Sequence, residues 1–156
     1  MSTGTTGLRS GRIVVGVSGS AASSAALAWA HERAKRRDWT LDVVAAWPDL
    51  GEPTIHEVPG HFNAARGRAV AGLNAALAAC GVELDGPTVR VWVENDDPVE
   101  ALVARCEGAD LLVLGTAHDG RSRRRGLPSV HELCLGRVRC PVVQVDFPDG
   151  DLRSSA

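Results

Sequence analysis

The amino-acid sequence predicts a doubly wound α/β domain, in which a parallel β-sheet carries helices on both faces. Five short apolar runs rich in Val, Ile and Leu alternate with four segments of helical periodicity along the 156 residues. The runs lack the alternation of apolar and polar residues that is typical of a sheet with one solvent-exposed face. Each strand is therefore expected to be buried on both faces. The length suits one domain, which we expect at residues 12–146, with flexible ends at residues 1–11 and 147–156.

Local signals place the elements of the N-terminal half. Ser20 is expected to cap a helix that ends in basic residues near Arg37, where cations favour the helix dipole. An apolar period that begins at Phe62 predicts a second helix, and Gly81 ends it. Three prolines and two glycines make residues 48–60 a long loop. The expected elements are strands at 12–17 and 40–47 and helices at 20–37 and 62–80.

The C-terminal half shows two further helix starts. Asp97 and Pro98 supply an N-cap and a first helical residue, and Ser129 with Glu132 has the pattern of a capping box. Between these starts, residues 116–128 form a loop rich in Gly and Arg. The expected elements are strands at 88–93, 110–115 and 141–145 and helices that open after residues 97 and 129.

Composition excludes several classes of function. The 17 basic and 19 acidic residues give a net charge of −2, so no general basic field attracts nucleic acid or an anionic membrane. No apolar run approaches the roughly 18 residues of a membrane span, and we expect a cytoplasmic protein without specific nucleic-acid binding. The four cysteines show no C-x-x-C pair and no zinc-ligand spacing, so they are expected to be reduced thiols. They are Cys80, Cys106, Cys134 and Cys140.

The expected topology points to a ligand crevice at the carboxyl ends of the strands, where the strand order reverses. That edge brings together the turn at Ser18 and the loop after the fourth strand. Residues 115–129 hold three glycines and four arginines before a capped helix, and their N–H and guanidinium groups favour an anion such as phosphate. A solvated loop whose arginines aid solubility is the alternative. The arginines are Arg121, Arg123, Arg124 and Arg125.

Catalytic motifs are absent or incomplete. Residues 115–122 imitate a P-loop, but further arginines and a proline separate them from the next helix. No G-x-G-x-x-G follows a strand, and no Ser or Cys nucleophile has an evident base and orienting group. His56 and His61 lie in the long loop, where nothing fixes a geometry for a metal. We therefore expect binding, and slow nucleotide hydrolysis by His118 or Asp119 is the enzymatic alternative.

Four segments resemble the universal stress protein family. They are residues 12–20 (R-I-V-V-G-V-S-G-S), 110–115 (D-L-L-V-L-G), 129–130 (S-V) and 140–145 (C-P-V-V-Q-V), and the likeness covers about residues 11–146. The resemblance implies a flavodoxin-like, Rossmann-like sheet of five parallel strands in the order 3-2-1-4-5. It also implies dimers formed through the last strand and, in one branch of the family, an ATP site at the switch point. The other branch lacks nucleotide binding.

The chain departs from the nucleotide-binding branch at three positions. The pattern G-x2-G-x9-G-[ST] after the fourth strand aligns with Gly115, His118, Pro128 and Ser129, so two of its three glycines are missing. Ser18 stands where the family usually places an Asp near the nucleotide. The loop arginines offer side-chain donors in place of the lost backbone donors. We therefore expect ATP binding to be weak, altered or absent.

Two binding functions remain open. The first is a dimeric cytoplasmic stress-response protein that regulates an unidentified protein partner, with a dimer formed through Val142, Val143 and Val145 of the apolar edge strand. The second is an adenine-nucleotide module that binds ATP with Mg²⁺, with the base near the end of the second strand and the phosphates on the loop. The candidate nucleotide-binding residues are Ser18, Ala45, Ala46, Gly115, His118, Arg121, Arg123, Arg124, Arg125, Ser129 and Val130.

Overall fold

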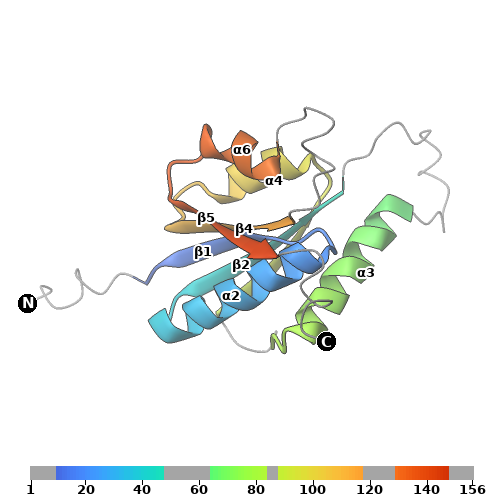
Figure 1. The fold of residues 1–156 in the computed structure, drawn as a ribbon, viewed down its shortest axis with the longest axis horizontal. Helices are drawn as coiled ribbons and strands as arrows, with labels where there is room; N and C mark the ends of the chain where they lie inside the picture. Colours follow the sequence, from blue (N-terminus) through green and yellow to red (C-terminus); the bar gives the residue numbers. More distant parts are fainter. Residues whose placement is uncertain (1–9, 48–63, 84–87, 118–128, 148–156) are drawn as a thin grey trace, which may run out of the picture.

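The computed structural model describes residues 10–47, 64–83, 88–117 and 129–147, which form one five-stranded parallel sheet (Figure 1). The strand order is β3-β2-β1-β4-β5, as the family resemblance implied, and every neighbouring pair is parallel. The central strand β1 therefore pairs with both β2 and β4. The strands are β1 (Arg12–Gly16), β2 (Thr40–Ala46), β3 (Val89–Glu94), β4 (Leu111–Ala117) and β5 (Val142–Phe147).

Helices cover both faces of the sheet, as the doubly wound class requires (Figure 1). The helices α2 (Ala21–Arg37) and α3 (Ala64–Ala79) pack on one face, over a core that includes Ile13 and Val15. On the other face, α4 (Pro98–Arg105) and α6 (Val130–Leu135) pack over a second core that includes Val14. Successive residues of β1 therefore enter opposite cores, which confirms that this strand is buried on both faces.

The helix caps agree with the sequence signals. The Ser20 side chain accepts a hydrogen bond from the Ser23 N–H at the start of α2, and Asp97 accepts from two N–H groups of α4. The helix α2 ends at Asp38, which adopts the left-handed conformation with φ 55°. Strand ends differ from the expectation by one or two residues. The strands β4 and β5 run on together to Ala117 and Phe147, because their parallel pairing continues to these two residues.

A buried carboxylate ties the amino ends of the strands together. Asp42 of β2 is 1% exposed and accepts hydrogen bonds from Arg12 (Nη1 to Oδ2, 2.8 Å) and Arg90 (Nε to Oδ1, 2.7 Å). Burial alone would raise the pKa of Asp42, but the bonds from Arg90 and Arg12 outweigh it and hold the pKa below its usual value. Arg12 also donates to the main-chain oxygens of Arg105 and Glu107, which joins the end of α4 to the sheet.

Candidate functional site

The switch point lies between the carboxyl ends of β1 and β4. After β1 the chain enters α2 on one face of the sheet, whereas the helix that follows β4, α6, lies on the other face. The register places Val15 opposite Val113 and Gly16 opposite Val44, so the ends of β1, β2 and β4 reach the same edge. The structure therefore places Ser18 at the edge where a doubly wound fold binds its ligands.

Three serines form a hydroxyl cluster in the turn after β1. The Ser18 hydroxyl donates to Ser20 Oγ (3.1 Å), and the Ser18 N–H donates to Ser23 Oγ (3.1 Å). Ser20 Oγ also accepts from the Ser23 N–H, so its own proton stays available for another acceptor. Ser18 and Ser20 are exposed, whereas Ser23 is buried. Sequence reasoning missed Ser23, although the spacing Ser20-x-x-Ser23 next to a helix start was a usable signal.

Gly115 has a packing role at this edge. A Cβ atom at Gly115 would lie 2.1 Å from the Ala22 carbonyl oxygen, so the first turn of α2 rests directly on β4. A second close approach lies nearby: Gly19 adopts φ 89°, and a Cβ on Gly72 would lie 3.1 Å from the Gly19 Cα atom. Both α2 and α3 are thus held tightly against the strand ends. A phosphate contact at Gly115 stays a prediction.

Ser129 forms hydrogen bonds with the first turn of its own helix, α6. Its Oγ accepts a hydrogen bond from the Glu132 N–H (3.1 Å), and its N–H donates to Glu132 Oε2 (3.2 Å). The predicted capping box is therefore confirmed. A phosphate that took these groups would compete with the Glu132 carboxylate. The next residue, Val130, is 39% exposed.

The expected base-binding residues differ in burial. Ala45 is 1% exposed as a whole residue and lies in the core beneath α2 and α3, so it offers a ligand almost no surface. Ala46 is half-buried against the core beneath α4, and Trp47 follows with its N–H bonded to the Glu94 oxygen (2.9 Å). His118, Asp119 and the four arginines of residues 121–125 lie outside the described residues, as do His56 and His61.

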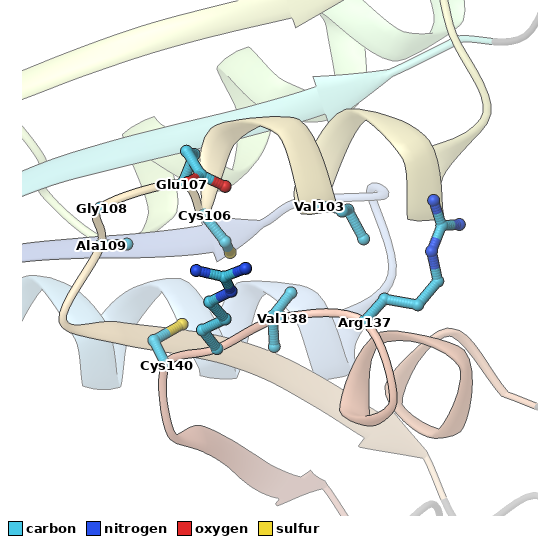
Figure 2. A pocket seen from close by; sticks show the side chains of 9 residues that line it. Val103, Cys106, Glu107, Gly108, Ala109, Arg137, Val138 and Cys140 are labelled. Carbon is cyan, nitrogen blue, oxygen red and sulfur yellow. The ribbon is translucent and has the colours of Figure 1, made fainter.

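Two pockets bounded by described residues lie away from the switch point. One of about 310 Å³ opens near the C-terminal ends of α4 and α6, where Cys106, Arg137 and Cys140 help to line it (Figure 2). The other, of about 450 Å³, runs along α2 beside β5, between Trp29 and Val145. Within the described part of the chain, no group of three or more His, Cys, Asp or Glu side chains is placed to hold a metal ion. No helix there is long and apolar enough to cross a membrane.

Strand order and the position of the switch point define a flavodoxin-like α/β domain of the class that binds ligands at the carboxyl edge of its sheet. A model of the Universal stress protein family matches residues 10–146. The chain belongs to the universal stress protein family.

Curated proteins agree with this assignment. Universal stress protein Rv2005c of Mycobacterium tuberculosis strain H37Rv is 35% identical over 145 residues, which cover 88% of this chain and 48% of the relative. The chain spans about half the length of the curated relatives that it matches.

The similar solved structures include complexes with nucleotides. A universal stress protein in complex with cAMP has a TM-score of 0.58 and 24% identity, over 86% of this chain and 95% of its own. The universal stress protein from Archaeoglobus fulgidus in complex with dAMP has a TM-score of 0.60 and 18% identity, over 88% of this chain and 98% of its own. Both likenesses show the same fold.

Proposed function

We propose that this universal stress domain acts by binding rather than by catalysis, and that its ligand is an adenine nucleotide held weakly at the switch point. The carrying observation is the turn after β1, where Ser18 and Ser20 present neutral hydroxyl groups and no described carboxylate or imidazole forms a catalytic pair with them. Neutral donors suit recognition of a sugar or phosphate oxygen. We place this function in the cytoplasm of stressed cells, where a protein partner recognises the nucleotide-bound form of the domain.

The solved structures with cAMP and dAMP support the choice of ligand. In the proposed site, the base lies near the main chain of Ala45 and Ala46, and the phosphate is directed toward Ser20 and Ser129. The arginines of residues 121–125 add cationic donors, with Mg²⁺ as the companion of ATP. Weak affinity follows from two features of the chain: Ser18 replaces the family's acid, and the Glu132 carboxylate already occupies the Ser129 N–H.

The first test is a titration of the full chain with AMP, cAMP and ATP, with and without Mg²⁺, by isothermal titration calorimetry. We expect dissociation constants of roughly 0.1–1 mM for the adenine nucleotides and weaker binding of GMP. Failure of every adenine nucleotide to bind at about ten times this concentration would reject the proposed ligand. If the chain releases phosphate from ATP and His118→Ala abolishes this release, the proposal that the domain acts without catalysis is rejected.

Glu132→Gln is expected to raise the affinity for AMP about fivefold. Glutamine also completes a capping box, so the helix start is preserved while the negative charge beside the phosphate is removed. Glu107→Gln is the matched control, because Glu107 is an exposed acid beyond the end of α4, near the pocket at the opposite edge. An unchanged or reduced affinity of Glu132→Gln would contradict the position assigned to the phosphate.

A second part of the proposal is a homodimer formed through β5. Among the described residues this strand ends the sheet, so one row of its N–H and C=O groups has no partner strand there. Its side chains alternate, since Val143 and Val145 face the core beneath α2, whereas Val142 faces the core beneath α4 and α6. The curated relatives have the length for a second domain of this size, which supports a two-domain assembly.

Val143→Glu is expected to convert the dimer to a monomer and to weaken association at least about 100-fold, because it places a charge on the half-buried edge strand through which two copies would pair. Light scattering coupled to size-exclusion chromatography measures the mass. Val89→Glu is the matched control: Val89 lies on β3, at the other edge of the sheet, and is half-buried against the same core as Val143. A Val143→Glu dimer with native circular dichroism would exclude this surface.

A further inference from the structure

A pair of thiols faces the pocket near the ends of α4 and α6. Cys106 caps the C-terminal end of α4, and Cys140 lies two residues before β5. Figure 2 shows the two side chains directed into the same hollow, which both residues line, and the two thiols lie close enough to interact electrostatically. The two residues are 34 positions apart in the chain, so this contact is a product of the fold. Nothing in the proposed nucleotide site uses it.

The two thiols differ in exposure and in acidity. Cys106 is 5% exposed, whereas Cys140 is half-buried and reachable from the pocket. Burial raises the pKa of both thiols, and the interaction between them raises the pKa of Cys106 further while it partly opposes the rise at Cys140. The nearby Arg12 guanidinium also favours the thiolate form of Cys140.

We propose that Cys106 and Cys140 form a reversible disulfide by exchange with a small-molecule disulfide of the glutathione type. The Cys140 thiolate attacks one sulfur of the small disulfide, forms a mixed disulfide and releases one small thiolate. Cys106 then loses its proton, attacks the Cys140 sulfur and displaces the second small thiolate. In total, two protein thiols are oxidised to one disulfide, and one small disulfide is reduced to two thiols.

The local structure favours a small movement of the main chain at Cys140, which would let the disulfide with Cys106 form. Cys106 is held by α4, since its N–H donates to the Leu102 oxygen (2.9 Å). Residues 137–141 lie outside helix and strand, and the ladder with β4 begins only after Cys140, where the Leu112 N–H donates to the Pro141 oxygen (2.9 Å). The disulfide joins the end of α4 to the entry of β5. The disulfide closes the loop between residues 106 and 140. We therefore expect the midpoint temperature of thermal unfolding to rise by roughly 5–10 °C and to fall back to its original value when dithiothreitol reduces the bond.

The test treats the full, folded chain with excess oxidised glutathione and follows intact mass, free thiols and peptide maps. The expected product has lost two titratable thiols, is two hydrogen atoms lighter and yields a peptide cross-linked between Cys106 and Cys140. Cys106→Ser should stop at a glutathione adduct on Cys140, and Cys140→Ser should form neither adduct nor bridge at this pocket. Cys80→Ser is the matched control, because Cys80 is also half-buried but packs on the other face of the sheet.

Three outcomes would overturn the assignment. One is a native chain that keeps all four thiols while the urea-unfolded chain reacts. Another is a mapped bridge that includes Cys134, which is fully buried in α6 beside the pair. The third is a Cys106→Ser chain without an adduct on Cys140. The peptide map of the unaltered chain decides the question even if a serine variant fails to fold.

Discussion

Asp42→Ala is expected to lower the free energy of unfolding by about 3 kcal/mol. The substitution leaves the guanidinium groups of Arg12 and Arg90 beside each other without the buried carboxylate that both of them bond. Breaking a buried ion pair typically costs about 3–5 kcal/mol, and the lower end applies because the Arg90 side chain is 49% exposed. Urea unfolding followed by tryptophan fluorescence measures the change.

The control for this prediction is an exposed ion pair. In α2, Arg36 Nε lies 3.3 Å from Glu32 Oε1, and the two side chains are 74% and 56% exposed. Glu32→Ala should therefore change stability by less than about 0.5 kcal/mol. A loss below about 1 kcal/mol for Asp42→Ala would show that the buried carboxylate is not a main support of the sheet.

The same carboxylate predicts a pH dependence. Because Arg90 and Arg12 hold the pKa of Asp42 below its unfolded value, the native state favours the ionised form. The contribution is complete above the unfolded pKa of about 3.9 and is lost as pH falls through the lower native pKa. The stability gap between the unaltered chain and Asp42→Ala should thus be constant at neutral pH and shrink below about pH 4.

Gly115→Ala is expected to destabilise the domain by about 3 kcal/mol, at the upper end for overpacking. The new Cβ atom would lie 2.1 Å from the Ala22 oxygen and 2.8 Å from the Ser23 nitrogen, so main chain rather than a flexible side chain must move. The displaced part is the first turn of α2, next to the serine cluster. We therefore also expect the affinity for AMP to fall, which calorimetry on the folded variant measures.

Gly136→Ala supplies the matched comparison. Gly136 follows α6 with φ −83°, and a Cβ atom there meets nothing within 4 Å. Alanine should therefore be neutral or stabilising by up to about 0.5 kcal/mol, because it restricts the unfolded chain. Equal stabilities of the Gly115→Ala and Gly136→Ala chains would mean that α2 moves away from β4 freely.

The sequence predicted the fold well because its signals are local. Caps such as Ser20, Asp97 and Ser129 act within a few residues of themselves, and strands buried on both faces are visible as apolar runs. The position of the site at the switch point stays a prediction, which rests on the topology of a doubly wound sheet.

Contacts between distant segments were beyond such reasoning. The sequence shows Asp42 within the apolar run of residues 40–46. Its burial there is explained only by the strand register, which sets it opposite Arg90. The packing role of Gly115 depends on where α2 comes to rest, and the thiol pair depends on two segments that meet only in the fold. The role of the arginines at residues 121–125 stays a prediction.

The central position of β1 also bears on how the chain folds during synthesis. The Arg12 N–H donates to Asp110 Oδ2 (2.9 Å), and these residues are 98 positions apart. At roughly 5–20 residues per second, a ribosome needs several seconds to complete β4 after β1 has emerged. During that interval, the edge of β1 that will pair with β4 lacks its partner. The nascent chain therefore exposes an unpaired, aggregation-prone strand edge, and a chaperone would have to shield it until β4 has been synthesised.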